Sequence, residues 1–528
     1  MKLTFVLSGI LIFLISFNIY CQNAYVDIQK YTHHITISDN NDTIIGVSDI
    51  EILFNKSTDT FWLDLVNKNS EGKGMKVSKV TQNGKPLSFS QSNDKLYINF
   101  AATTGNNEAF LVHYSGVPAS GLIISKNKYG DRTFFGDNWP NGARHWIPCI
   151  DHPSDKAYVT WKVTAPSHYQ VIANGMLTEE TDLDNESKLY VWESNVVLPT
   201  KVMVIGVSKF AVEYLGDVEN IPLSSWVYPQ NKEAGFYDFA QAKDILKYFI
   251  THIGPYPYEK LANVQSTTYW GGMENASNIF YPENSITGRR EKEATVVHEI
   301  VHQWFGDSAS EKDWPHLWLS EGFATYLTDI YYEDTYGHEV FVKRMESERQ
   351  NVLEFAQMQY TPVVDYETED YMQLINANSY SKGGWFLHML RNKIGDENFW
   401  LGIRKYYETY KFSNATTDDF RMILEEVTGQ NLQEFFNQWL LIAGHPELAI
   451  KKSIIGKELN LSITQNQKSK HTFTFPLEVK LTYSNGSEEI KVLEIEERKE
   501  EFQLSLSGKL KNMVFDPNTR LLFNKTIH

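Results

Sequence analysis

The stretch His298-Glu-Ile-Val-His302 carries two histidines four positions apart, with a glutamate directly after the first. On a helix, residues four apart share one face, so both imidazoles can reach a single metal ion. Glu299 then stands about 100° round the helix from His298, near the metal without having to bind it. Packed histidines and a solvated glutamate are the alternative interpretation of so short a pattern.

Glu321 follows His302 after eighteen intervening residues, within Leu317-Trp-Leu-Ser-Glu-Gly-Phe-Ala-Thr325. The spacing of the apolar residues in this stretch favours a second helix. Two histidines and one carboxylate are typical of a catalytic zinc site, because three protein ligands leave the fourth position open for water. A structural site would need a fourth protein ligand, and the chain has only 2 cysteines. We therefore predict one Zn²⁺ per chain, held by His298, His302 and Glu321.

A third segment, Gly271-Gly-Met-Glu-Asn275, lies in a strand-like stretch ahead of the histidine pair. With it, the chain resembles the zinc aminopeptidases of peptidase family M1, whose thermolysin-like (gluzincin) catalytic domain pairs a Gly-x-Met-Glu-Asn strand with a His-Glu-x-x-His helix and a distant glutamate. Further segments match this family in the same order: Ala143-Arg-His-Trp-Ile-Pro-Cys-Ile-Asp151, Trp304-Phe-Gly306, Ser379-Tyr-Ser-Lys-Gly383 and Phe435-Phe-Asn-Gln-Trp-Leu440. The resemblance covers nearly the whole chain beyond its amino-terminal apolar run.

The resemblance implies a zinc-dependent aminopeptidase that hydrolyses the first peptide bond of peptides with a free amino terminus. It implies that Glu299 is the general base, that Tyr380 donates a hydrogen bond to the oxyanion, and that Glu274 holds the substrate's α-amino group. An ammonium group entering a closed pocket needs a charged acceptor. A surface position for Glu274 and a buried structural role for Tyr380 are the alternatives. The predicted substrate-binding residues are Gly271, Gly272, Met273, Glu274 and Asn275.

Two positions depart from the family pattern. Asp307 follows Trp304-Phe-Gly306 where relatives usually carry asparagine, and it either tunes the metal ligands or simply occupies a loop. Asp137 stands where a glutamine commonly helps to hold the amine or the first side chain. Either Asp137 joins Glu274 as a second acidic acceptor, or its loop is reshaped and contributes nothing. The unusual sequence around Trp139-Pro140 favours the second interpretation.

The patterning predicts a multidomain α+β chain. Short alternating runs such as 31–37, 159–163 and 201–207 predict a β-saddle or sandwich, helical spacing dominates up to residue 443, and strands return after Pro446. We expect a signal peptide (1–21), an amino-terminal β domain (22–228), a mainly α, thermolysin-like zinc catalytic domain (229–445) and a small carboxy-terminal β-sandwich (446–528). From the resemblance we expect a short form without the helical carboxy-terminal domain of many relatives, with an open cleft that admits longer peptides unless a second subunit covers it.

Composition and the amino terminus limit partners and location. With 42% hydrophobic and 22% charged residues the chain is an ordinary globular protein, and its net charge of −17 argues against nucleic-acid binding. Lys2, an uncharged apolar run to Tyr20 and a polar stretch from Gln22 predict a signal peptide and export to the periplasm or medium. An uncleaved membrane anchor is the alternative. We expect no transmembrane span in the mature chain, and the sequence does not indicate an oligomeric state.

Three rival functions remain compatible with the zinc ligands. A thermolysin-like endopeptidase would use the same three, but the Gly271-Gly-Met-Glu-Asn275 segment argues against it. Epoxide hydrolysis, which a specialised branch of the family performs, would require a lipid pocket that nothing in the sequence indicates. An inactive binding protein that kept the fold is disfavoured because Glu299 and Tyr380 are both present.

Overall fold

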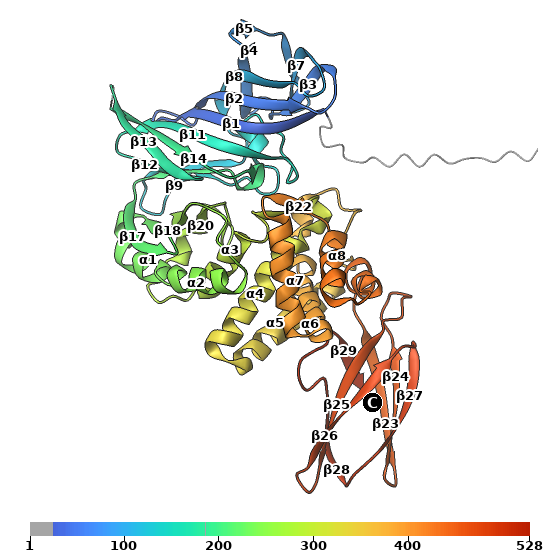
Figure 1. Cartoon of the computed structure of the whole chain (residues 1–528). Coiled ribbons are helices and arrows are strands. Elements are labelled where there is room, and N and C mark those ends of the chain that lie inside the picture. Colours follow the sequence, from blue (N-terminus) through green and yellow to red (C-terminus); the bar gives the residue numbers. More distant parts are fainter. Residues whose placement is uncertain (1–24, 185) are drawn as a thin grey trace, which may run out of the picture.

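A computed structural model describes residues 25–184 and 186–528, which form three parts in a row (Figure 1). β-Sheets make up the first part, helices most of the middle part, and a β-sandwich the last part. The predicted multidomain α+β class is therefore confirmed. The predicted signal peptide, residues 1–21, lies outside the described residues. Within the described ranges, no helix combines the length and hydropathy needed to cross a membrane.

A nine-stranded sheet is the framework of the first part. Along β1 (Val26–Thr36), the side chains of Tyr31, His33 and Ile35 are buried among more exposed neighbours, because successive strand residues point to opposite faces. The order of the sheet is β13 (Met176–Leu183), β14 (Ser187–Glu193), β11 (Lys156–Pro166), β1, β2 (Ile44–Phe54), β8 (Asn107–Val117), β4 (Gly74–Gln82) and β5 (Lys85–Pro86), with β15 (Leu198–Pro199) also paired to β11.

Two smaller sheets complete the first part. Phe61 of the first of them packs on Phe110 of the large sheet with ring centres 4.9 Å apart. The first consists of β3 (Thr58–Asp64), β7 (Lys95–Ala102) and β6 (Phe89–Ser92), and the second of β12 (Gln170–Ala173), β16 (Ile205–Ser208), β10 (Arg132–Gly136) and β9 (Leu122–Lys126). The strand predicted at 201–207 is thus only partly correct, because Thr200–Val202 form a 3₁₀ turn in which the side chain of Lys201 leaves the strand pattern to pair with Glu311.

The middle part begins with a sheet that crosses a predicted boundary. Its order is β17 (Ala211–Val218), β18 (Ile221–Val227), β19 (Leu261–Ser266) and β20 (Asn278–Pro282). β18 pairs in parallel with β19, although the boundary predicted at residue 228 lies between them. By strand pairing, the middle part therefore starts before β17. The other domain boundaries stay predictions.

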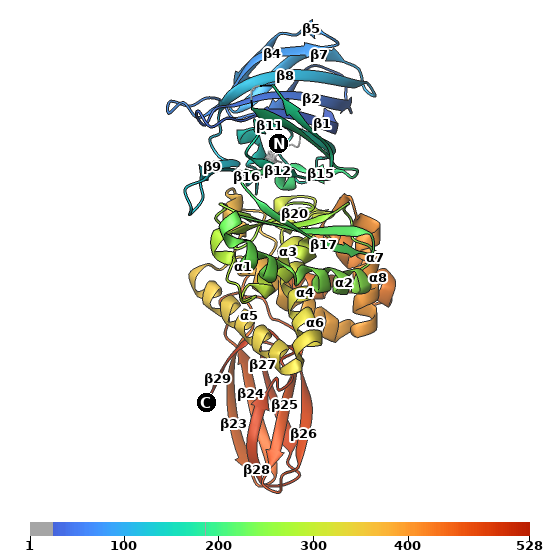
Figure 2. The same cartoon turned by 90° about the vertical axis from the view of Figure 1, so that its left-hand side faces the viewer.

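Helices fill the rest of the middle part, and α1 and α2 lie against β17 and β18 (Figure 2). Gly337 separates α4 from α5 with a φ of 93°, a backbone conformation that glycine adopts without steric cost. Thr416 begins α8 with a capping box to Asp419. The helices are α1 (Lys232–Phe239), α2 (Ala242–His252), α3 (Glu293–His302), α4 (Trp318–Tyr336), α5 (His338–Met358), α6 (Gly383–Ile394), α7 (Asp396–Tyr410), α8 (Thr417–Thr428) and α9 (Gln433–Phe436), with β21 (Ala309–Glu311) and β22 (Ser413–Ala415) paired beside them.

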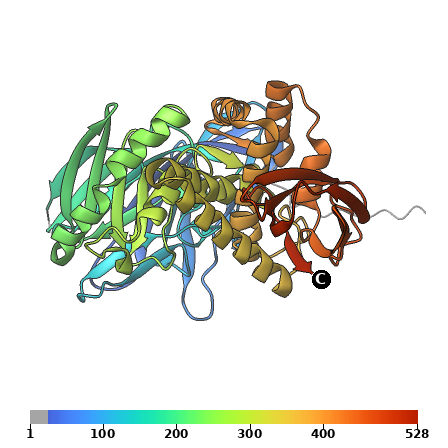
Figure 3. The same cartoon turned by 90° about the horizontal axis from the view of Figure 1, so that it is seen from below.

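The last part is a two-sheet sandwich. In β24 every second residue is buried, which gives each sheet one apolar face. Seen from below, the sandwich lies on the side of the later helices, away from β17 and α1 (Figure 3). One sheet consists of β27 (Lys499–Ser505), β24 (Glu458–Gln465), β23 (Glu447–Ile455) and β29 (Asn524–Ile527), and the other of β26 (Glu488–Ile495), β25 (Phe475–Tyr483) and β28 (Leu510–Phe515).

Buried lysines join the first part to the middle part. Lys201 donates to the Glu311 carboxylate over 2.6 Å, and both side chains are shielded from solvent. Lys156 donates to the backbone carbonyl of Ser308 over 2.7 Å. Because an unpaired charge in the interior is costly, these contacts fix the β part against the region that follows α3.

We predict that Lys201→Met destabilises the protein by about 3–5 kcal/mol, because it leaves the buried Glu311 carboxylate without its cation. Urea denaturation followed by tryptophan fluorescence measures the change. Lys201→Met/Glu311→Leu should recover much of the loss. The exposed pair of Lys499 and Glu501 supplies the control, and an equal loss of stability in Lys499→Met and Lys201→Met would contradict the prediction.

Candidate active site

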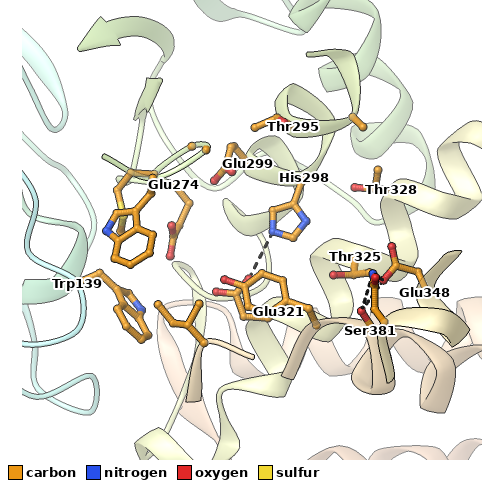
Figure 4. A pocket seen from close by; sticks show the side chains of 18 of the residues that line it. Trp139, Glu274, Thr295, His298, Glu299, Glu321, Thr325, Thr328, Glu348 and Ser381 are labelled. Carbon is orange, nitrogen blue, oxygen red and sulfur yellow. Dashed lines mark hydrogen bonds and ion pairs between the residues drawn. The ribbon is translucent and has the colours of Figure 1, made fainter. Parts of the chain in front are cut away.

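The three predicted metal ligands meet where α3 faces α4. His298 and His302 lie one turn apart, with their Nε2 atoms 3.0 Å from each other. Glu321, in the first turn of α4, brings Oε2 to 3.4 Å from His298 Nε2 and 3.3 Å from His302 Nε2. Figure 4 shows the Glu321 carboxylate pointing toward the His298 ring. The three ligand atoms all lie within 4.8 Å of one another, which is close enough to share one metal ion.

The donor set fits a zinc-type cation. The Nδ1 atom of His302 lies 3.1 Å from the Phe305 carbonyl and 3.0 Å from the Ser320 hydroxyl, and a proton on Nδ1 leaves the Nε2 lone pair free for a metal. Burial lowers the pKa of His298, which favours its neutral, ligating form. Two imidazole nitrogens and one carboxylate oxygen are ligands that Zn²⁺ prefers.

Glu299 lies beside the triad and faces the Gly271–Gly272 backbone. A Cβ atom at Gly272 would stand 2.2 Å from Glu299 Oε1, so a side chain at that position would displace the carboxylate. Burial raises the pKa of Glu299, and the negative charges of Glu274 and Glu321 raise it further. A carboxylate with a raised pKa is a stronger proton acceptor.

The segment from Gly271 to Asn275 is extended but is not a strand. Only Met273 pairs, exchanging backbone hydrogen bonds of 2.8 and 2.9 Å with Phe280, and a turn with positive φ at Ser277 follows. Because the turn starts so soon, no ladder can form, which corrects the predicted strand. Four predicted residues line the cavity at the triad: Gly271, Gly272, Met273 and Glu274. Asn275 is buried beneath the turn and is not part of this wall, contrary to its predicted contact with substrate.

Gln303 connects this segment to the metal helix. Its Nε2 donates to the Glu274 carbonyl over 2.7 Å and to Asp307 Oδ2 over 3.0 Å. Its Oε1 accepts from the Ser277 N–H over 2.8 Å. The Asp307 side chain therefore fixes the amide that supports Glu274, while its backbone N–H donates to the His302 carbonyl over 3.1 Å. The sequence prediction missed Gln303, although its place directly after His302 was an available signal.

Tyr380 lies on a π-helical turn, Asn378–Lys382. Its ring stacks on that of His298, with centroids 5.9 Å apart and planes 8° from parallel. Burial raises the pKa of the phenol well above its usual value, and the Glu321 carboxylate adds to the rise. Tyr380 therefore keeps its proton and can donate it in a hydrogen bond.

A cavity of about 440 Å³ is lined by Glu274, His298, Glu299, Glu321 and Tyr380. A second cavity, of about 760 Å³, adjoins it, and Trp139 and Trp270 line both. Asp137 lines only the adjoining cavity. Burial and the charge of Glu274 raise the pKa of Asp137 to about 6. The charge of Glu274 thus influences Asp137, while the predicted alternatives for Asp137 both stay open.

Comparison with known families agrees with this geometry. Residues 28–202 match the Peptidase M1 N-terminal domain, and residues 237–439 match the Peptidase family M1 domain. The chain belongs to peptidase family M1. The two matches fall on the parts that supply Asp137 and the metal triad, respectively.

Several proteins that the chain resembles in sequence are named aminopeptidases. The chain is 29% identical over 409 residues to probable aminopeptidase 2 of Sulfurisphaera tokodaii, which covers 74% of this chain and 51% of that protein. It is 30% identical over 376 residues to glutamyl aminopeptidase of Homo sapiens, covering 66% of this chain and 39% of that protein. The chain therefore spans about half the length of these relatives, or less.

Solved structures support the M1 fold. The M1 zinc metallopeptidase from Deinococcus radiodurans aligns with a TM-score of 0.69 at 24% identity, over 80% of this chain and 95% of that one. A mutant of that protein bound to a Tyr-Ser-Ala substrate gives a TM-score of 0.67 at 23% identity, over 79% and 94% of the two chains.

Removing a triad ligand should remove the metal. We expect Glu321→Ala to lose bound zinc during dialysis, because two imidazoles alone leave an incomplete ligand set. Elemental analysis of the dialysed protein measures the content. His316→Gln is the control, since His316 is a buried histidine that contacts Thr417 rather than the triad. Equal zinc content in Glu321→Ala and the unaltered protein would count against the site.

Proposed function

We propose that this protein is a zinc-dependent aminopeptidase that removes the first residue from peptides with a free amino terminus. The observation that carries the proposal is the position of Glu274, whose carboxylate lines the same cavity as His298 and Glu321. Among the described residues, Glu274 Oε1 is buried without a hydrogen-bond partner. A buried carboxylate with an unused oxygen is suited to receive an ammonium group from a ligand.

In this scheme the metal site acts on the carbonyl group of the first peptide bond. Zn²⁺ held by His298, His302 and Glu321 would supply a Lewis acid that lowers the pKa of water and polarises the peptide carbonyl. Glu274 binds the substrate's α-amino group, so that only the first peptide bond reaches the triad. This restriction distinguishes an exopeptidase from an endopeptidase with the same ligands.

Two further side chains move or hold a proton. Glu299 accepts a proton from the attacking water and returns it to the leaving nitrogen, a role that its raised pKa favours. Tyr380 donates a hydrogen bond to the oxygen on which negative charge develops. The family membership and the named aminopeptidases among the relatives support this assignment of roles.

Partners and location follow from the same proposal. The substrates are peptides with a free amino terminus, and one Zn²⁺ per chain suffices for the chemistry. The apolar run after Lys2 supports export, in accordance with a signal peptide.

Glu299→Gln should retain zinc and lower kcat by about 10²–10⁴-fold, because the amide cannot accept the proton. Hydrolysis of an aminoacyl fluorogenic substrate, measured with zinc content, tests both halves of this statement. Glu293→Gln, at the start of the same helix and bonded to Tyr336, is the matched control and should behave as the unaltered protein. A Glu299→Gln variant that keeps a tenth of the rate would refute the general-base role.

Acetylation of the substrate's amino group should abolish cleavage, because Glu274 then meets a neutral amide instead of an ammonium group. The experiment compares each peptide with its acetylated form and analyses the products by mass spectrometry. Internal cleavage of the acetylated peptide would identify an endopeptidase instead.

A further inference from the structure

The active-site cavity has a second charged end. In Figure 4, Glu274 lies on one side of His298 and Glu321, and Thr325, Thr328, Glu348 and Ser381 lie on the other. Arg344 lines the same cavity and precedes Glu348 by one turn of α5. Residues after the cleaved bond must extend away from Glu274, so this end is the one that would receive them.

Two contacts fix the Arg344 side chain and leave part of its guanidinium group free to bind a ligand. Its Nε donates to Asp329 Oδ1 over 2.6 Å, and its guanidinium carbon lies 4.3 Å from the centre of the Tyr332 ring. Within residues 25–184 and 186–528, its two Nη groups donate no hydrogen bond that would occupy them. A fixed guanidinium with free Nη groups is pre-organised for a carboxylate.

The neighbouring acids leave the Nη groups of Arg344 open. Asp329 pairs with Nε, and burial raises the pKa of this carboxyl to about 7 while the charge of Arg344 lowers it. Glu348 accepts from the Ser381 hydroxyl over 2.6 Å. Among the described residues, Glu348 makes no ion pair with Arg344.

The spacing along α4 sets the length of a peptide that reaches both ends. Asp329 follows Glu321 by eight residues, which is about 12 Å of helix at 1.5 Å per residue. An extended chain covers about 3.3–3.6 Å per residue. Three or four residues beyond the cleaved bond therefore bring a terminal carboxylate to the level of Arg344. The cavity volume of about 440 Å³ is in the range that encloses a ligand of that size.

We propose that Arg344 binds the free carboxylate of short peptides, and that the enzyme favours substrates of four or five residues. Glu274 takes the ammonium end and Arg344 takes the carboxylate end, with the first peptide bond between them at the triad. The proposal rests on the aminopeptidase function proposed above. It runs against the expectation of an open cleft for longer peptides, because a longer chain cannot place its carboxylate at Arg344.

The test compares peptides that differ only in their carboxyl terminus. The zinc-loaded full chain is assayed on Leu-Gly-Gly-Gly and Leu-Gly-Gly-Gly-Gly as free acids and as amides, and on longer peptides of the same series. We expect kcat/KM to be about 10–100-fold higher for each acid than for its amide, the effect of a hydrogen-bonded charge pair. The preference should disappear in the longer peptides.

Variants of α5 assign the preference to Arg344. Arg344→Met should bring the ratio of acid to amide close to one, and Arg344→Lys should leave an intermediate ratio because it keeps charge without the planar pair of donors. Lys343→Met removes an exposed charge from the same helix and should leave the ratio unchanged. A leucine anilide, which has no carboxylate, reports whether each variant is folded and loaded.

Each outcome bears on a separate statement. Equal rates on acid and amide in the unaltered protein overturn the carboxylate site, and this comparison needs no variant to fold. A preference that survives in Arg344→Met overturns the role of Arg344. Failure of the unaltered protein to hydrolyse the anilide overturns the aminopeptidase function itself.

Discussion

The close approach of α3 to α4 is the constraint on which the site depends. The triad requires one carboxylate from α4 to face two imidazoles from α3, and small residues make the surrounding contacts possible. A Cβ atom at Gly306 would lie 2.2 Å from Ser320 Oγ, next to the contact that Ser320 makes with His302. A Cβ atom at Gly322 would lie 2.9 Å from the Gly383 backbone, so this glycine lets the turn that carries Tyr380 reach α4. Because glycines stand at these two positions, α3, α4 and the turn that carries Tyr380 can meet at one point.

Negatively and positively charged side chains lie on different sides of that point. Carboxylates gather on one side, where burial and the charge of Glu274 raise the pKa values of Glu299 and Asp137. A buried cation, Lys201, lies at the junction with the β part. It pairs with Glu311, and the negative charge of Glu274 also acts on it. The junction between the two parts therefore also places a buried ion pair within electrostatic reach of Glu274.

Sequence patterns predicted the parts of the site that depend on local spacing. Two histidines at helical spacing and Glu321 in an apolar helix can be recognised one segment at a time, because a helix fixes which residues share a face. The strand predicted at Gly271 failed, since the turn at Ser277 depends on an amide from another element. The sheet that joins β18 to β19 was missed because strand alternation does not identify the pairing partner. Gln303 and Arg344 were missed for the same reason: their partners lie far along the chain or on a different helix.

The support beneath Glu274 explains why the departure at Asp307 is compatible with the proposed function. A carboxylate at that position can only accept, and the Gln303 amide needs an acceptor for the proton that it does not give to the Glu274 carbonyl. Because Gln303 donates its two Nε2 protons to the Glu274 carbonyl and to Asp307, its Oε1 faces Ser277 and accepts from that N–H. The turn after Glu274 is thereby fixed on both sides. An asparagine could serve equally well only with its oxygen turned to Gln303 and its amide group given a separate acceptor. Asp307 has no amide group to satisfy, although its Oδ1 is buried without a hydrogen-bond partner among the described residues. Through Gln303, the position of Glu274 is tied directly to the helix that carries the metal ligands.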